Sequence, residues 1–419
     1  MSFRKFPYAA AIGLGIAGLL GPEWAAAQSA SPVTIEFAAW QFTEKGRGEK
    51  LNALVDKFMQ GHPDIKIEKV AVPYPQFEQT IFTQAGQGAG PDVFVLGDDA
   101  FPKAVNAGFF EPLGELMDLP SLNLTSVNED AVIDGKQYGL VWGANTYNLI
   151  YNKELLSSIG AKVPASYEEF LDVAKRLQEK GVFAFAFRTT SAETAGMWYD
   201  VSNWVYGAGG RWAKDGQPEF DGPQVVEGVD RLANIYKSGY VPKGADAATY
   251  RRMFWEGKVA MFIDNLSLPG IIAAGNPDMR DKIGVARNPF QSGDHASLTT
   301  FIGINANSKN KKAAAEFMSY LFSQEGQLAL YELLGGVSVG TKLDLSNNPL
   351  GGNAPWLGEM EAAIEAQRAV STVPEGLAQK ASELRTVMSE ALEQVLFNGT
   401  SAQDAMKKAQ EQAKAIAAE

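Results

Sequence analysis

The sequence predicts an α/β fold of two domains behind an export signal, and three observations indicate this. The chain has 419 residues, which is long for a single hydrophobic core and natural for two domains. Segments with strand and helix patterns alternate along it, the order typical of an α/β sheet. The first residues, 1–27, have the composition of a signal peptide.

The amino-terminal segment combines the three parts of such a signal. Arg4 and Lys5 are basic, Ala9–Leu20 is an apolar and glycine run, and Ala25–Ala27 supplies small residues for cleavage. The apolar run has about 12 residues, against the roughly 20 that a membrane-spanning helix needs. We therefore expect a mature chain that begins near Gln28, and a permanent membrane anchor is the alternative.

The composition restricts both the cellular compartment and the classes of partner that we expect for this protein. The chain has no cysteine, so we expect neither a lipid anchor at a cleavage-site cysteine nor disulfides. The mature protein is expected to be free in the bacterial periplasm and monomeric. The formal net charge of −12 argues against nucleic acid or an anionic membrane as partner, because either needs a basic face.

The first half of the mature chain alternates strands and helices. Val33–Trp40 has the alternating apolar residues of a strand, and apolar residues at 51, 54, 55 and 58 have helical spacing. Ile65–Val72 is predicted to be a second strand. The continuous apolar run Val93–Leu96 suits a buried parallel strand.

The second half repeats this pattern. Ser166–Glu169 is a capping box that opens a helix, and Lys214–Pro218 predicts a hairpin tip. Further strands are predicted in apolar, β-prone runs, namely Tyr138–Tyr151, Phe183–Phe187, Val259–Ile263 and Phe301–Asn305. After the helix Lys311–Phe322 we expect a crossover loop at Ser346–Pro355, and then helices over Leu357–Glu419.

Several motifs, in order, resemble the family 1 extracellular solute-binding proteins, the periplasmic receptors of ABC importers. They cover essentially the whole mature chain: Trp40, Gly90–Val93, Asp134–Leu140, Leu149–Leu155, Phe254–Met261 and Gly303–Ser308. The resemblance implies the type II periplasmic-binding-protein fold, in which a multi-segment hinge joins two α/β lobes around a ligand cleft. It places lobe I at 28–144 and 300–343, and lobe II at 145–299 and 344–419.

The resemblance also implies ligand contacts on lobe I. Trp40, Gln41, Glu44 and Lys45 follow the first strand, where members of the family contact sugars. Glu44 and Lys45 match an acidic and basic pair that binds hydroxyls in maltose-binding members, through charge-assisted hydrogen bonds. The alternative for this pair is a solvated loop.

Further candidates follow the later strands of this lobe. Asp98 and Asp99 come after the third strand, and Asp99 matches a hydroxyl-binding aspartate of the family. The alternative for an aspartate here is a cap for a helix at 100–107. Asn145 stands where maltose-binding members have an acidic contact, and this change suggests a different ligand polarity. Tyr147 is a weaker candidate.

Lobe II contributes a cluster of aromatic residues. Sugars stack their apolar faces on aromatic rings, so we expect one or two of these residues to face the cleft, with Trp198 as the first candidate and Trp204 as the second. The alternative is that they pack in the core. The cluster comprises Trp198, Tyr199, Trp204, Tyr206 and Trp212.

Other lobe II candidates are polar. Arg188 and Arg211 are available for an anionic ligand, although surface roles are the alternative. Asp264 and Asn265 end a strand where the family has ligand contacts, but its stacking tryptophan shortly afterwards is absent here, and Ser267 is nearest. Gly336 belongs to a loop that lines the cleft in the family.

These expectations together indicate a receptor that captures a mono- or oligosaccharide or polyol and delivers it to a membrane-embedded ABC permease. An anionic sugar derivative or glycerophosphodiester is the alternative ligand. A secreted glycoside hydrolase is the remote alternative, since it needs two carboxylates facing each other across a bond, and Asp98 and Asp99 are adjacent. No histidine has zinc-ligand spacing, and no cofactor is expected.

Overall fold

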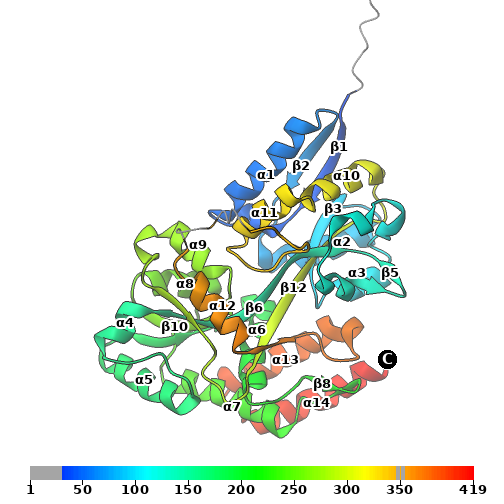
Figure 1. Cartoon of the computed structure of the whole chain (residues 1–419). Helices are drawn as coiled ribbons and strands as arrows, with labels where there is room; N and C mark the ends of the chain where they lie inside the picture. Colours follow the sequence, from blue (N-terminus) through cyan, green and yellow to red (C-terminus); the bar gives the residue numbers. More distant parts are fainter. Residues whose placement is uncertain (1–30, 346–349, 351–353) are drawn as a thin grey trace, which may run out of the picture.

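The computed structural model describes residues 31–345, 350 and 354–419, so the expected signal peptide and most of the expected crossover loop at Ser346–Pro355 lie outside the described residues. Two lobes, each built of strands covered by helices, lie on either side of two long strands (Figure 1). Among the described residues, no helix combines the length and apolar character needed to cross a bilayer.

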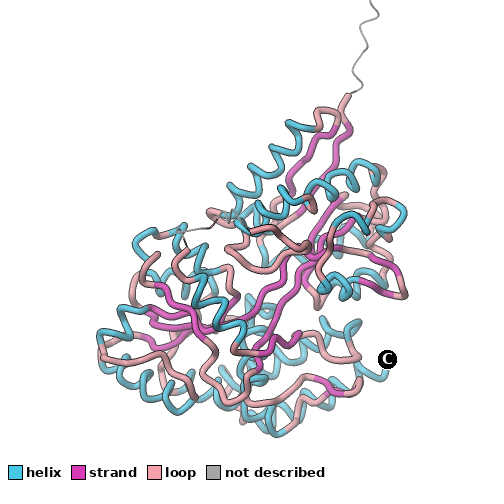
Figure 2. The backbone as a smooth tube through the Cα atoms, in the orientation of Figure 1, coloured by secondary structure: helices cyan, strands magenta, loops and turns pink. Residues whose placement is uncertain are grey.

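A nine-stranded sheet runs through the molecule in the order β2-β1-β3-β12-β6-β10-β7, with β11 and β13 paired beside this path. Figure 2 shows these strands converging on the centre between the helices. Strands β1 and β2, β1 and β3, and β10 and β7 are parallel, whereas β12 is antiparallel to both β3 and β6. The fold is therefore α/β with a mixed sheet, as predicted.

We define lobe I by three parallel strands and the helices that cover them. The predicted strands all form, and the short apolar run becomes β3, buried on both faces. The elements of lobe I are β1 (Val33–Ala38), β2 (Ile65–Val70), β3 (Val93–Gly97), α1 (Arg47–Gly61), α2 (Tyr74–Gly86), α3 (Phe101–Asn106), α10 (Lys311–Leu321) and α11 (Gln324–Leu333).

Strands β7, β10 and β11 and nine α-helices form the body of lobe II among the described residues. Ser166 caps its helix α5 as predicted, since its hydroxyl accepts a hydrogen bond from the backbone N–H of Glu169 at 3.2 Å. The elements are β7 (Phe183–Ala186), β10 (Val259–Asn265), β11 (Ile283–Ala286), α4 (Lys153–Ser158), α5 (Tyr167–Glu179), α6 (Thr194–Gly207), α7 (Pro223–Lys237), α8 (Ala247–Trp255), α9 (Leu268–Gly275), α12 (Leu357–Glu365), α13 (Ala381–Leu396) and α14 (Ala402–Ala418).

Strands β6 (Leu140–Asn152) and β12 (Asp294–Ile304) extend through both lobes. They pair with each other over Ser297–Ile302, and their register shifts between Thr300 and Phe301. On the lobe I side β12 pairs with β3, and on the lobe II side β6 pairs with β10 and β11. These two strands therefore connect the lobes through backbone hydrogen bonds.

Two small hairpins complete the described strands. The turn at Lys214–Pro218 forms the predicted hairpin between β8 (Ala213–Lys214) and β9 (Gln217–Pro218). A second hairpin joins β4 (Val132–Ile133) to β5 (Lys136–Gln137). One expectation is wrong: the segment after Leu357 is not helical throughout, because β13 (Arg368–Ser371) pairs in parallel with β12.

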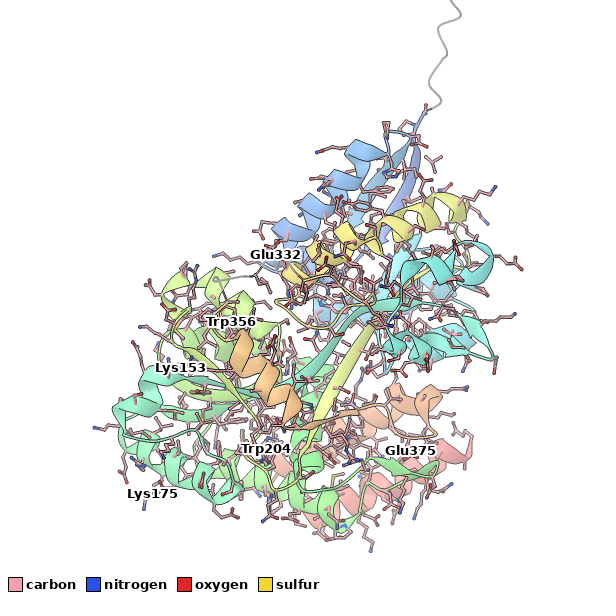
Figure 3. The ribbon with its side chains drawn as sticks, in the orientation of Figure 1. Lys153, Lys175, Trp204, Glu332, Trp356 and Glu375 are labelled. Carbon is pink, nitrogen blue, oxygen red and sulfur yellow. The ribbon has the colours of Figure 1, made fainter. Side chains whose placement is uncertain are left out.

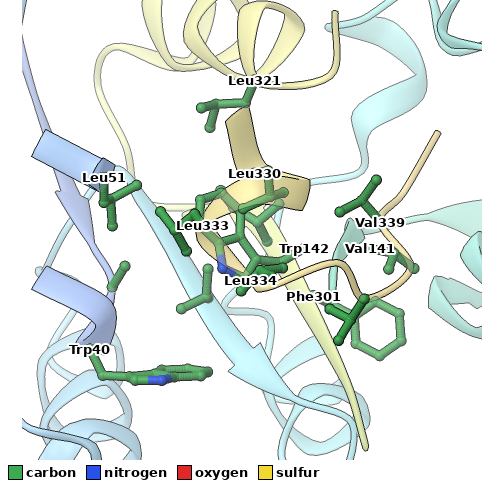
Figure 4. Close-up of a cluster of buried hydrophobic side chains, with 14 of the residues drawn as sticks. Trp40, Leu51, Val141, Trp142, Phe301, Leu321, Leu330, Leu333, Leu334 and Val339 are labelled. Atoms are coloured by element: carbon green, nitrogen blue, oxygen red, sulfur yellow. The ribbon is translucent and has the colours of Figure 1, made fainter. Parts of the chain in front are cut away.

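Each lobe has a hydrophobic core. In lobe I, Trp142 of β6 lies among Leu330, Leu333 and Leu334 of α11 and its carboxyl end (Figure 4). This cluster continues into lobe II along one face of β10, at Phe262. The second cluster packs the other face of the lobe II strands against α5, α6, α7, α13 and α14.

Trp204 is a central contact of the second core. Its ring meets Phe170, Phe185 and Phe290 at centroid distances of 6.0, 5.7 and 5.0 Å.

Trp204→Ala is expected to lower the free energy of unfolding by about 3–5 kcal/mol, because the partners cannot collapse into the space of an indole. Urea unfolding measures this change. Phe397→Ala, at a residue 42 % exposed, is the control and should cost less than about 1 kcal/mol; equal losses in the two variants would contradict the assignment of Trp204 to the core.

Candidate functional site

A row of three cavities lies between the two lobes. The central cavity has a volume of about 190 Å³ and is lined by both lobes, with Trp40 and Tyr74 from lobe I and Tyr199 and Arg251 from lobe II. Asn145 of β6 lines it where that strand passes from one lobe to the other. A neighbouring cavity of about 330 Å³ shares Trp40 and Tyr74 with it. A third, of about 240 Å³, shares Arg47 and Ser267 with the central cavity. Together they form one elongated cleft.

Strand ends deliver these residues to the cleft. Trp40 follows β1, Tyr74 opens α2 after β2, and Gly97 ends β3, so three carboxyl ends of parallel strands meet here. This edge is where open α/β sheets bind ligands. Asn145 lies on β6 directly opposite Leu298 of β12, and both line the central cavity. The ends of the cleft also draw on both lobes: Glu332 and Trp356 line the third cavity from different sides (Figure 3).

Aromatic rings form part of the cavity wall. Trp40 meets Tyr74 edge to face at a centroid distance of 5.3 Å, and Tyr74 is 37 % exposed. From lobe II, Tyr199 stacks on Tyr147 at 5.3 Å with an interplanar angle of 8°. Burial raises the pKa of both tyrosines well above the usual value, so their phenols stay neutral and can donate hydrogen bonds.

Several buried polar atoms of the cavity lining have no hydrogen-bond partner within the described part of the chain. Gln41 Oε1 and Asn145 Oδ1 are acceptors, and Arg47 Nε and Arg251 Nε are donors. An unsatisfied buried polar group costs about 1–3 kcal/mol. A ligand with both donor and acceptor groups would supply the missing partners.

The arginines that line the central cavity are paired with carboxylates. Arg47 contacts Glu44 at 2.8 Å, Arg188 contacts Asp200 at 2.8 Å, and a third pair joins Arg251 to Asp264 at 3.1 Å. Arg188 also contacts Glu193 at 3.1 Å. The cavity therefore has no excess of positive charge from these residues.

Asp264 belongs to this charge network and does not line the cavity. It is fully buried and accepts a hydrogen bond from the Tyr250 hydroxyl at 2.5 Å. Burial alone would raise the pKa of this carboxyl, but Arg251, Arg188 and the Tyr250 hydroxyl outweigh it and lower the pKa. The expected ligand role of Asp264 is thus corrected to one of fixing the arginines. Its neighbour Asn265 lines the cavity, with its amide group held by Asp264 at 2.9 Å.

The candidate residues after β1 line two different cavities of the cleft. Trp40, Gln41 and Glu44 line the central cavity. Lys45 lines the third cavity instead, and Glu44 pairs with Arg47 rather than with Lys45. Glu44 and Lys45 therefore lie in neighbouring parts of the cleft, and their binding of ligand hydroxyls stays a prediction.

The structure places the two aspartates after β3 in different surroundings. Asp98 does not line the described cavities, and its carboxylate accepts a hydrogen bond from the Thr299 N–H at 3.0 Å. Asp99 lines the 330 Å³ cavity, but its carboxylate is bound by Arg385 of α13. Neither caps a helix, since the residue before α3 is Ala100 and no side chain caps it.

Among the lobe II aromatics, Tyr199 lines the cavity, which agrees with the expectation that one or two of the cluster face the cleft. Trp198 and Trp204 do not. Both are buried in the second core, where Trp198 stacks on Trp212 at a centroid distance of 4.8 Å. They belong to the core because α6 packs closely against α7, α13 and β12.

Arg211 and Gly336 do not line the described cavities, although Gly335, next to Gly336, lines the third. Arg211 pairs with Asp294 and covers the Tyr206 ring at 5.2 Å, so the pair neutralises it. Gly336 has a φ of +95°, and a Cβ there would lie 2.9 Å from the Leu357 side chain. Its role is to let the chain pass close to α12.

Sequence reasoning missed Tyr74, Arg47 and Arg251 as residues of the cleft. Tyr74 could have been found, because it follows the carboxyl end of a predicted strand. Arg47 stands three residues after Glu44 on the first turn of α1, and this spacing pairs side chains. Arg251 carried no signal, since an arginine on an amphipathic helix is ordinarily solvated.

A cleft between two α/β lobes, lined by aromatic rings and unpartnered polar groups from both, defines a ligand-binding protein. Over residues 43–328 the sequence matches the profile of the bacterial extracellular solute-binding proteins, and the chain belongs to this family. The family is one of secreted or periplasmic binding proteins. Among the described residues no cluster of histidine, aspartate or glutamate suited to a metal is found.

Individual relatives have similar sequences or folds. The chain is 26% identical to the galactooligosaccharide-binding protein of Bacillus subtilis over 345 residues, 78% of each chain. It is 28% identical to the diacetylchitobiose binding protein DasA of Streptomyces coelicolor over 314 residues, 71% of this chain and 70% of that protein. The GacH receptor of Streptomyces glaucescens, crystallised unliganded and with acarbose, has the same fold with a TM-score of 0.80 at 21% identity, over 93% of this chain and 100% of that chain.

The position of Asp98 makes stability depend on pH. Burial raises the pKa of its carboxyl to about 7, against about 3.9 in an unfolded chain. Between these values the folded state binds more protons than the unfolded state, so the free energy of unfolding falls as pH rises from about 4 to about 7.

Asp98→Asn keeps an acceptor for Thr299 and removes the titration. In urea unfolding at pH 5 and pH 8, the variant should be more stable than wild type at pH 8 by up to a few kcal/mol, and the gap should shrink at pH 5. A gap that does not depend on pH would contradict the raised pKa.

Proposed function

We propose that this protein is a periplasmic receptor that binds a neutral carbohydrate between its lobes and delivers it to an ABC permease. The observation that carries the ligand class is the wall of the central cavity. Trp40 and Tyr74 offer aromatic faces, while Gln41, Asn145 and Arg251 offer unpartnered hydrogen-bonding atoms. Sugars combine apolar C–H faces with hydroxyls that both donate and accept.

Within the central cavity, charge favours a neutral ligand over an anionic one. An anionic group would need a cation without a carboxylate partner, and Arg47, Arg188 and Arg251 each have one within 3.1 Å. Arg211, the other cation considered for this role, pairs with Asp294 outside the cavities. A sugar phosphate would therefore face carboxylates as well as arginines, which costs free energy in a partly desolvated site.

The sequence relatives support the carbohydrate class. Those named for a galactooligosaccharide and for diacetylchitobiose each match more than two thirds of this chain. Their ligands are oligosaccharides, and the row of three cavities offers an elongated cleft of the kind that such ligands need. We propose the lobe boundaries 28–144 with 300–343, and 145–299 with 344–419, with a chain that is monomeric, performs no catalysis and begins near Gln28 after export.

The ligand class is tested by a thermal-shift screen of the purified mature protein. The panel contains monosaccharides, galactooligosaccharides, diacetylchitobiose, maltodextrins, sugar phosphates and glycerol phosphates. A ligand present at about a hundred times its Kd stabilises the protein by about 2.7 kcal/mol. Stabilisation by neutral sugars alone supports the proposal. Stabilisation only by phosphates would replace it with the anionic alternative, and release of a product from any sugar would show an enzyme.

Asn145 offers a sharp test of the binding wall. Its Oδ1 has no partner in the described chain, so Asn145→Ala should leave the apo melting temperature nearly unchanged. It should weaken binding of the sugar found in the screen by about 1–3 kcal/mol, roughly 5- to 150-fold in Kd. Titration calorimetry measures the affinity.

Asn148, three residues along the same strand, is the matched control. It is fully buried and its amide donates to Gln367 Oε1 at 2.9 Å. Asn148→Ala should lower the apo melting temperature and leave the affinity nearly unchanged. If the two variants showed the reverse pattern, Asn145 would be a structural residue and the binding wall would lie elsewhere.

A further inference from the structure

Outside the central cavity, charged side chains bridge the two lobes at one end of the cleft. Arg385 of α13, in lobe II, contacts Glu78 of α2 at 2.7 Å and also pairs with Asp99 after β3, both in lobe I. Nearby, Lys103 of α3 contacts Glu383 of α13 at 2.8 Å. We call these ion pairs the α13 latch, because all of them join α13 to lobe I.

The pairs of the latch differ in burial. The side chains of Arg385 and Asp99 are 12% and 5% exposed, so both charges have lost most of their water. Lys103 and Glu383 are 39% and 38% exposed, and such a surface pair contributes little alone, about 0–1 kcal/mol. Arg385 is therefore the residue on which the latch depends.

Burial of these charges depends on the lobes lying together. Arg385 belongs to a helix packed in the lobe II core, whereas Asp99 and Glu78 are fixed to lobe I strands and helices. Separation of the lobes would break the ion pairs and return the charges to water. The pairs therefore exist only in the arrangement in which both lobes line the cleft.

We propose that Arg385 is a positioning residue that sets the affinity for ligand by stabilising the closed arrangement of the lobes. This inference rests on the proposed function, in which the lobes close on a sugar. For a ligand that binds only the closed form, the apparent Kd equals the Kd for that form divided by the fraction of molecules that are closed. Any interaction that stabilises closure therefore strengthens binding. Arg385 also lines the 330 Å³ cavity, so the distance between the lobes without ligand, rather than affinity alone, is the measurement that tests this role.

The absence of cysteine allows a direct measurement of closure. Cysteines introduced by Lys175→Cys in lobe II and Lys309→Cys in lobe I, both exposed, can carry a pair of fluorophores. In the mature protein without ligand, Arg385→Gln should shift energy transfer toward longer distances. The same variant should weaken calorimetric binding of the panel sugar that wild type binds by about tenfold.

Two comparisons separate the latch from a general effect of charge. Arg252→Gln removes an exposed arginine whose partner Glu256, at 3.9 Å, lies in the same lobe, and it should change neither the distance nor the affinity. Lys103→Glu should open the lobes partly, and combining it with Glu383→Lys should restore closure. This exposed pair keeps the test valid if Arg385→Gln does not fold.

Energy transfer and affinity that are unchanged in both Arg385→Gln and Lys103→Glu would overturn the proposal. A shift of the same size in Arg252→Gln would also overturn it, because the effect would then not belong to contacts between the lobes. If no sugar of the panel binds wild type, the proposed function fails, whereas the distances measured without ligand still decide the role of Arg385.

Discussion

The antiparallel pairing of β6 with β12 is the constraint on which the rest of the molecule depends. These strands pass through both lobes and hydrogen-bond to each other where the lobes meet, from Ser297 opposite Thr146 to Thr299 opposite Ala144. The pairing sets the position of Asn145 in the cleft. It also positions the strands of each lobe, because β3 pairs with β12 in lobe I and β10 and β11 pair with β6 in lobe II. The register shift after Thr300 is an irregularity of the kind that bends and twists paired strands, and here it lies where the sheet passes from one lobe to the other.

Much of this architecture follows from local pattern. The alternation in β1, the continuous apolar run of β3 and the cap at Ser166 each specify an element through contacts within a few residues. The short strand β13 was missed because its residues are mostly exposed and carry no alternation. It forms because β12 offers an unpaired edge, which is information that a local window of sequence does not contain.

The site was less predictable than the fold, for two physical reasons. First, α6 has aromatic residues on several faces and buried polar residues between them, so its sequence could not show that Tyr199 faces the cleft while Trp198 and Trp204 enter the core. Second, Asp99 is bound by an arginine 286 residues away. Such a pairing forms only when the whole chain is folded, and no local sequence pattern around either residue predicts it.

The charges in the cleft are distributed in a way that suits a neutral ligand. In the centre, each arginine is paired within its own lobe, as Arg47 with Glu44 and Arg188 with Asp200. Such pairs persist whether or not the lobes meet, so they leave hydroxyl recognition to groups without partners. At the end of the cleft the pairing of Arg385 runs between lobes. The pairs in the centre are therefore the same whether the lobes are apart or together, whereas those at the end form only when the lobes meet. Because the attraction between two charges weakens as they separate into water, the pairs at the end stabilise the closed arrangement.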